Sequence, residues 1–228
     1  MARGIDVPMV DTIARVVFTD RADGDYRVDG PASGLDELRR KVINESWTWL
    51  RQVHGAAVVT ARTPGDGAGA TADAAITTAV RVPIAVTTAD CAPVVLVGDV
   101  GIGVAHAGWR GLVTGVVKHT AAALTAAGVR PRRTLLGPCI DPGHYEFSPA
   151  DLDQVAAILG DEVRSVTPSG TPALDVPAAV AAACERAGWP RPDRPPATSD
   201  PTWFSHRVRA DTGRQTTVAW LEPTGAGS

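Results

Sequence analysis

The pattern of apolar and polar positions along the chain predicts a mixed α/β fold. Apolar runs of strand length recur between residues 15 and 106, and several are nearly continuous. Such runs are typical of strands that are buried on both faces. Strands are predicted over 15–20, 47–53, 56–61, 74–78, 82–88, 94–97, 102–106 and 217–221.

Helices are predicted mainly in the second half of the chain. Ser33 and Asp36 have the spacing of a capping box, and Gly128 and Gly188 have the positions of C-terminal caps. Mixed β-sheets in the middle with peripheral helices follow from this order of elements, an α/β fold in the broad sense that includes α+β. The expected helices begin near Ser33, cover 111–127, run from Ser148 to about 159 and cover 177–187.

The chain is predicted to form one domain over residues 1–228. A length of 228 residues is at the upper end of what one domain usually holds. The proline-rich segment 190–201 is predicted to be an extended connector inside that domain, because the roughly 25 residues after it are too few to fold alone.

Three turns between the predicted elements carry residues with metal-binding or anion-binding chemistry. Two β-prone runs flank His54-Gly55, which favours a hairpin with an exposed imidazole at its turn. Pro93 is unfavourable in a central strand, so Cys91 is expected at a bulge or a strand break, with its thiol directed into a cavity. Residues 107–111 are expected to form a strand-to-helix turn, whose backbone N–H groups suit an anion.

The composition is ordinary for a globular protein and narrows the class of function. Apolar residues make up 44% of the chain and charged residues 21%, which argues against a disordered chain and against a disulfide-rich scaffold. With a net charge of −3, the chain has no excess of positive charge, which argues against nucleic-acid or anionic-membrane partners. The oligomeric state is left open between a monomer and a small homo-oligomer.

The first ten residues lack the apolar core of a secretory signal, and no run approaches the length of a membrane span. A cytoplasmic location is therefore expected, where thiols stay reduced. Cys91, Cys139 and Cys184 are accordingly predicted to be free thiols.

His54, Cys91 and His106 are the candidate metal ligands. Two imidazoles and one thiolate suit Zn²⁺ and leave the fourth tetrahedral position for water or substrate, and copper also accepts this set. Spacing alone is a weak signal, because 37 residues separate the first two ligands and 15 the next two. A buried structural cysteine and two polar loop histidines are the alternative interpretation.

Several motifs resemble those of the YfiH-like family, also called the laccase-domain or polyphenol oxidase family. They occur in the order of that family between Arg51 and Leu221, and TADC-x-P and HAGWRG are the most specific. The matching motifs are QVHG, TADCAPVVL, HAGWRG, GPCI-x-P-x-x-YE, FSHR and TGR.

This resemblance implies a layered αββα fold and a metal, normally zinc, bound by His54, Cys91 and His106. Family members of this type are described as purine nucleoside phosphorylases that also deaminate adenosine and cleave methylthioadenosine. The resemblance thus implies a zinc-dependent enzyme that converts inosine or adenosine and phosphate to the free base and ribose 1-phosphate.

The sequence departs from the family pattern in two places. Residues 19–34 read TDRADGDYRVDGPASG where the family usually has a Gly-Gly-rich loop and an Asn-containing LNLG-like block. Residues 197–200 read ATSD where the family often has a Cys-Thr pair. Neither the substrate-loop contacts nor a role for a C-terminal thiol carries over to this chain.

Three further residues near these motifs are candidates for catalysis or substrate binding. Arg110 is the candidate phosphate or ribose contact, and a structural arginine paired with a carboxylate is the alternative. Asp90 is a candidate catalytic residue that would orient His54 or His106 by a hydrogen bond without binding the metal itself. The alternative is an aspartate that caps a turn. Cys139 is a candidate cavity-lining catalytic thiol or a plain core residue.

Four other residues have weaker support. His206 and Arg207 lie in the FSHR motif and are candidate substrate contacts. Asp73 is a candidate acid of the site or a solvated turn residue. Glu146 is a candidate general acid or a structural partner.

Other functions use the same residues. A copper-dependent, laccase-like oxidation of phenols would use the same donors, although the usual multicopper arrangement needs more than the five histidines present. A hydrolase of cell-wall precursors would use Cys91 as nucleophile and His54 or His106 as base. A metal-binding or nucleotide-binding protein without turnover is the remaining class.

Overall fold

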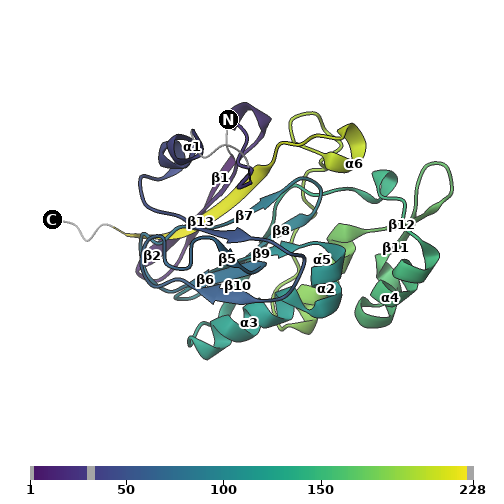
Figure 1. The fold of residues 1–228 in the computed structure, drawn as a ribbon. Coiled ribbons are helices and arrows are strands. Elements are labelled where there is room, and N and C mark those ends of the chain that lie inside the picture. The colour runs from purple at the N-terminus through teal and green to yellow at the C-terminus, as the bar shows by residue number, and fades with distance from the viewer. Residues whose placement is uncertain (1–2, 30–33, 225–228) are drawn as a thin grey trace.

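The computed structural model describes residues 3–29 and 34–224. Two mixed β-sheets lie face to face in its centre, and helices cover their outer faces (Figure 1). The six-stranded sheet has the order β1-β2-β13-β7-β3-β5, and the five-stranded sheet has the order β10-β8-β9-β6-β4. Strands β11 and β12 form a separate antiparallel pair beside α4.

The elements have the following bounds. The six-stranded sheet contains β1 (Arg3–Pro8), β2 (Thr12–Phe18), β13 (Gln215–Pro223), β7 (Ile84–Thr88), β3 (Thr48–Arg51) and β5 (Ala70–Thr71). The five-stranded sheet contains β10 (Pro131–Leu136), β8 (Ala92–Gly98), β9 (Ile102–Ala107), β6 (Ala74–Thr77) and β4 (Val58–Thr60). The small pair is β11 (Arg164–Val166) and β12 (Pro172–Leu174), and the helices are α1 (Leu35–Val42), α2 (Trp109–Thr114), α3 (Val116–Ala126), α4 (Pro149–Leu159), α5 (Val176–Arg186) and α6 (His206–Arg209).

Strand β8 shows why the apolar runs do not alternate with polar residues. Val95 and Val97 pack between the two sheets, whereas Val94 and Leu96 pack against the helices on the other face. Both faces of the five-stranded sheet are therefore buried, as near-continuous apolar runs predict. A third cluster, which includes Trp220, lies between the six-stranded sheet and α1. The predicted mixed sheets and αββα layers are confirmed.

The helix predicted over 111–127 is two helices in the structure. Gly115 has a φ of 87° and separates α2 from α3. A residue without a β-carbon adopts this left-handed conformation at little cost, so the chain bends there. The predicted cap at Gly128, which has a φ of 80°, is confirmed. Ser33 lies outside the described residues, and Gly34 is the N-cap of α1.

The hairpin predicted around His54 is wrong. Strand β3 pairs in parallel with β7 and β5, whereas β4 pairs in parallel with β6 of the other sheet. The chain thus crosses from one sheet to the other through His54, which has a φ of 59°. Local β propensity does not specify the partner strand, which tertiary packing decides. The prediction of an exposed imidazole at this turn is confirmed.

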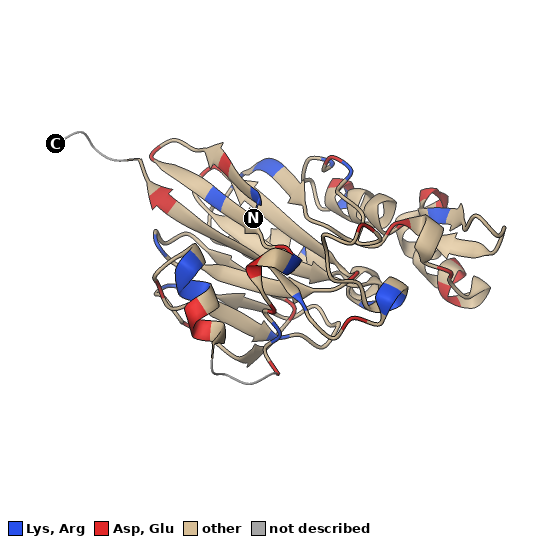
Figure 2. Ribbon diagram, turned by 90° about the horizontal axis from the view of Figure 1, so that it is seen from above, with Lys and Arg blue, Asp and Glu red and all other residues tan. Residues whose placement is uncertain are grey.

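Charged residues of both signs are spread over the molecule. Acidic and basic segments are interspersed along the ribbon instead of gathering on one side (Figure 2). Within residues 3–29 and 34–224, none of the helices has the length and apolar character needed to cross a bilayer.

Candidate metal centre

Three strand ends bring the predicted ligands together. His106 lies in β9, Cys91 immediately precedes β8, and His54 lies in the crossing from β3 to β4. Their donor atoms all lie within 4.8 Å of one another. The distance from Cys91 Sγ to His54 Nε2 is 3.8 Å, and the two imidazole centroids are 4.8 Å apart. The structure therefore joins three residues that are far apart in the sequence.

The register of β8 against β9 explains why Cys91 and His106 meet. Ala92 pairs with Ala107 and Pro93 pairs with His106, so the residue before β8 lies beside the end of β9. The chain turns into β8 through Asp90, which has a φ of 98°. The predicted strand break at Cys91 is confirmed, although Pro93 itself lies within β8.

Gly108 allows the backbone to approach the ligands closely. A Cβ atom at this position would lie 2.7 Å from Cδ2 of His54 and 3.2 Å from Sγ of Cys91. Any larger residue would displace the two ligands. Two imidazoles and one partly exposed thiol in such a space fit a zinc ion with three protein ligands and one open position.

Asp73 holds two of the three ligands in place. Its carboxylate is fully buried and accepts a hydrogen bond of 2.8 Å from Nδ1–H of His106. It also accepts hydrogen bonds from the backbone N–H groups of Val53, His54 and Gly55 at 2.8 to 3.1 Å. With Nδ1 bonded in this way, Nε2 of His106 is left to face the other ligands.

The burial of Asp73 overturns the interpretation of this residue as a solvated turn residue. Burial raises the pKa of its carboxyl, but the hydrogen bonds from His106 and the backbone outweigh burial and lower it. The signal in the sequence is a single acidic residue directly before the buried run of β6.

The thiol and the buried imidazole favour each other's charged forms. Burial raises the pKa of Cys91, but His106 and His54 outweigh burial and lower it. Burial lowers the pKa of His106, while the Cys91 thiolate and Asp73 raise it, and the net shift is upward. The thiolate is the form of cysteine that binds a metal. All three cysteines are free thiols, as predicted.

Asp90 binds the C-terminal segment and not an imidazole. Its carboxylate accepts hydrogen bonds from Thr198 Oγ1 at 2.7 Å, Ser205 Oγ at 2.6 Å and the backbone N–H of Arg207 at 2.7 Å. The expectation that Asp90 orients His54 or His106 is therefore wrong, because its acceptor atoms are directed to this segment. Asp90 instead ties α6 to the turn that carries Cys91.

The three ligands line a cavity of about 450 Å³. Its volume lies in the range of small-molecule sites. Four arginines from distant parts of the chain contribute to its wall, together with two acidic side chains, one aromatic side chain and one further imidazole. These residues are Arg27, Arg51, Arg207, Arg214, Asp29, Asp90, Tyr145 and His206.

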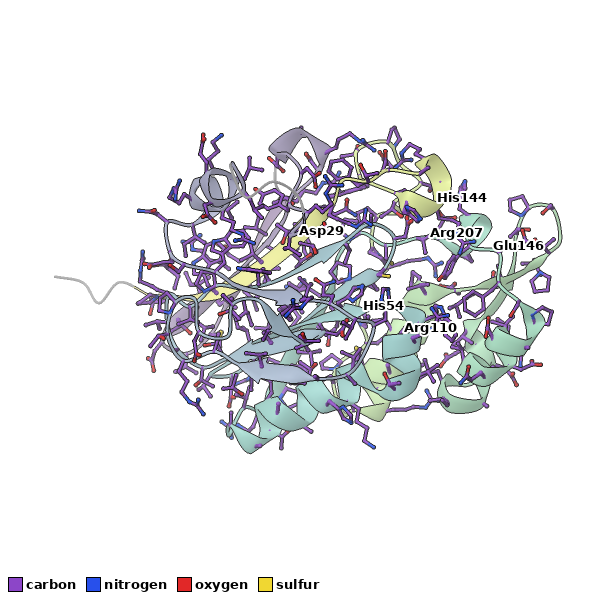
Figure 3. All side chains as sticks on the ribbon, viewed as in Figure 1. Asp29, His54, Arg110, His144, Glu146 and Arg207 are labelled. Atoms are coloured by element: carbon purple, nitrogen blue, oxygen red, sulfur yellow. The ribbon has the colours of Figure 1, made fainter. Side chains whose placement is uncertain are left out.

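The predicted substrate contacts lie on both sides of the opening. In the view of Figure 3, His54, Arg110 and Arg207 project into the space between α2 and α6. The Arg207 guanidinium lies 4.9 Å from the ring centroid of Tyr145. Arg110 is exposed, lies 4.4 Å from the Trp109 ring centroid and is not one of the residues that line the cavity.

Cys139 lies in the apolar core behind the cavity. Its side chain is 1% exposed and packs with the residues between the five-stranded sheet and the helices. Burial raises the pKa of its thiol far above the usual range. The expectation that this thiol lines the cavity is not met, because the side chain packs in the core and Cys139 is not among the residues of the cavity wall.

Sequence reasoning did not identify several residues of the cavity. Tyr145 lies in the GPCI-x-P-x-x-YE motif beside the candidate general acid Glu146, which is exposed and does not line the cavity. Arg27, Arg51 and Arg214 carry no local signal, because only the fold brings these distant positions together.

Comparisons with known proteins agree with the motifs. A purine nucleoside phosphorylase of Mycobacterium tuberculosis is 34% identical over 233 residues, which cover 97% of this chain and 89% of the relative. One from Streptomyces coelicolor is 38% identical over 181 residues, covering 76% of this chain and 74% of the relative.

Solved structures share the fold. A Neisseria meningitidis protein superposes with a TM-score of 0.80 at 24% identity, covering 97% of this chain and 99% of the other. The YfiH protein of Bacillus licheniformis gives a TM-score of 0.79 at 20% identity, covering 93% of this chain and 97% of the other. The family model described as multi-copper polyphenol oxidoreductase laccase matches residues 28–222, and the chain belongs to this family.

Proposed function

We propose that the chain is a zinc-dependent purine nucleoside phosphorylase. It would convert inosine or adenosine and phosphate to the free base and ribose 1-phosphate. The observation that carries this proposal is the meeting of His54, Cys91 and His106 in one cavity that is also lined by four arginines. The names of the Mycobacterium and Streptomyces relatives support the same reaction.

His54, Cys91 and His106 would hold the zinc ion. A bound zinc supplies Lewis acidity and water activation, the chemistry needed for an accompanying deamination at C6 of adenosine. Asp73 keeps the proton of His106 on Nδ1 and thereby leaves Nε2 for the metal. Gly108 leaves the space that these side chains occupy.

Arg207, Arg110 and His206 are proposed to bind phosphate and ribose. Among the described residues no carboxylate forms an ion pair with Arg207 or Arg110, whose guanidinium groups lie over aromatic rings. A guanidinium without a carboxylate partner is available for bidentate hydrogen bonds to phosphate. In this proposal Asp90 positions Arg207 through its backbone and takes no part in the chemistry.

Adenosine deamination and methylthioadenosine phosphorolysis are proposed as further activities of the same cavity. Both substrates share with inosine a purine ring system joined through N9 to C1′ of a ribofuranose, and a volume of about 450 Å³ admits a nucleoside.

A product assay tests the proposal. Zinc-loaded protein is incubated with inosine, adenosine or methylthioadenosine, with and without phosphate. Free base and a sugar 1-phosphate are expected only with phosphate, and inosine is expected from adenosine without phosphate. Absence of all these products would contradict the proposal. Activity that survives complete chelation would favour a hydrolase that uses Cys91 as nucleophile.

A copper-dependent oxidation of phenols is the second candidate. The matching family model carries that description, and the donor set also accepts copper. Oxygen consumption that depends strictly on added copper, in a preparation inactive on nucleosides, would favour this function over phosphorolysis.

A further inference from the structure

The side chain of Tyr145 contributes an aromatic ring and a hydroxyl group to the wall of the cavity. The side chain lines the same cavity as the three metal-binding residues. Within the described part of the chain its hydroxyl has no hydrogen-bond partner. Its backbone is fixed on both sides, because its N–H donates to Pro142 O and its carbonyl accepts from Leu174 N, both at 3.3 Å. Residues that contact a substrate are typically held in place by their surroundings and keep a hydrogen-bonding group available, as Tyr145 does.

Aromatic and cationic neighbours hold the Tyr145 ring in one orientation. Arg207 lies 4.9 Å from its centroid, and Phe147 lies 5.3 Å away at an interplanar angle of 57°. Phe147 is itself packed edge-to-face on Trp109, with centroids 5.3 Å apart. Arg207 thus covers a face of the ring and Phe147 contacts it at a tilt, and neither contact engages the hydroxyl group.

The hydroxyl stays protonated at physiological pH. Burial raises the pKa of Tyr145 to about 12, and the negative charges of Cys91 and Asp90 add to this effect against Arg207 and Arg110. The group is thus a hydrogen-bond donor that does not ionise under working conditions. Glu146, the next residue, is exposed and its side chain lies outside the cavity lining (Figure 3).

We infer that Tyr145 donates the hydrogen bond that stabilises the purine as it leaves the ribose. The inference rests on the proposed phosphorolysis. In that reaction a phosphate oxygen forms a bond to C1′, and the C1′–N9 bond breaks with its electron pair going to the purine. The proton that phosphate loses on forming the ester ends on a purine nitrogen. Tyr145 donates to the negative charge that develops on the purine and retains its own proton at the end.

The residues that line the cavity indicate that Tyr145 contacts the purine and not the phosphate. Phosphate is a dianion that arginines bind with two parallel hydrogen bonds, and the cavity contains four of them. The departing purine is planar, partly apolar and needs one donor for a diffuse charge. Tyr145, supported by Phe147 and Trp109, provides an aromatic wall with one O–H group.

A comparison of two substrates tests this role. Tyr145→Phe keeps the ring and removes only the oxygen. With inosine and phosphate, the variant is expected to lose about 100-fold in kcat, with little change in KM. With 7-methylguanosine, whose purine already carries a positive charge and needs no such donor, the variant is expected to retain nearly the wild-type rate.

The ratio of the two rates is measured on one preparation, so a loss of folded or metal-loaded protein cancels. Glu146→Gln is the matched control and is expected to behave as the wild type with both substrates. Equal losses with both nucleosides in Tyr145→Phe, full activity with inosine, or a selective loss in Glu146→Gln would each overturn the assignment. Wild-type protein without phosphorolysis would instead overturn the proposed function, and the role of Tyr145 with it.

Discussion

Two buried aspartates organise opposite sides of the cavity, and each gathers a different set of donors. Asp73 accepts hydrogen bonds from His106 and from the backbone around His54, so it fixes the metal-binding side. Asp90 accepts hydrogen bonds from Thr198, Ser205 and Arg207, so it fixes the side formed by the C-terminal segment. The first carboxylate orients the metal ligands, and the second orients residues proposed to bind substrate.

This comparison shows that closeness in sequence is a poor guide to what a buried carboxylate does. Asp90 is adjacent to Cys91, yet its partners lie 108 to 117 positions further along the chain. Asp73 precedes His106 by 33 positions and bonds directly to its ring. Substitutions at the two aspartates should therefore separate metal binding from substrate binding.

Cys91→Ser should have the largest effect, because Cys91 lies where the two sides meet. Loss of the thiolate removes one of three ligands, and we expect zinc affinity to fall by at least about 100-fold, with loss of phosphorolysis. Zinc affinity is measured by competition with a chromophoric chelator, and circular dichroism reports the fold. Retention of wild-type zinc affinity would show that Cys91 is not a ligand.

Asp73→Asn should weaken the metal side alone. The neutral amide is a poorer acceptor for His106 and for the three backbone N–H groups, so zinc affinity should fall by about 10- to 100-fold. The metal-free protein should also lose about 2 kcal/mol of unfolding free energy, measured in urea. Asp153→Asn, at an exposed position of α4, serves as the control. Unchanged zinc affinity in Asp73→Asn would contradict the role of this carboxylate.

Asp90→Asn should weaken the substrate side alone. The amide cannot accept all three hydrogen bonds, so α6 and Arg207 shift and KM for phosphate should rise roughly 10-fold. Zinc content, measured by elemental analysis, should stay at the wild-type level. Loss of zinc with an unchanged KM would mean that the two aspartates do not divide their roles as described.

Ser205→Ala should give the smallest effect. Ser205 donates to Asp90 and also caps α6 by accepting from Val208 N at 3.1 Å. Its loss should lower the unfolding free energy by about 1 kcal/mol and raise KM for phosphate less than Asp90→Asn does. A larger change in KM than that of Asp90→Asn would place the control of α6 in Ser205 and not in the carboxylate.

Much of the fold could be predicted from the sequence, because apolar runs and helix caps report local structure. The buried run of β8, the cap at Gly128 and the closing strand β13 follow directly from such signals. The true pairing of the strands on either side of His54 did not follow from local signals, because strand pairing depends on contacts between residues that are far apart in the chain. The helix break at Gly115 depends on a single left-handed residue within an otherwise helical pattern.

The site could be predicted only in part. His54, Cys91 and His106 were identified from motifs that resemble a family, since their spacing alone gives a weak signal. The burial of Asp73 and the position of Tyr145 in the cavity could not be predicted, because neighbouring residues in the sequence do not determine them. The four arginines of the cavity converge from positions between 27 and 214, which only the folded chain brings together.

The most direct test of the central claim is metal content and phosphorolysis measured on the same preparation. We predict close to one zinc ion per chain, loss of inosine phosphorolysis when zinc is removed by a chelator, and recovery when zinc is added back. The Cys91→Ser variant should show neither zinc nor recovery. Full phosphorolysis by metal-free protein, or stoichiometric zinc in the Cys91→Ser variant, would contradict the account.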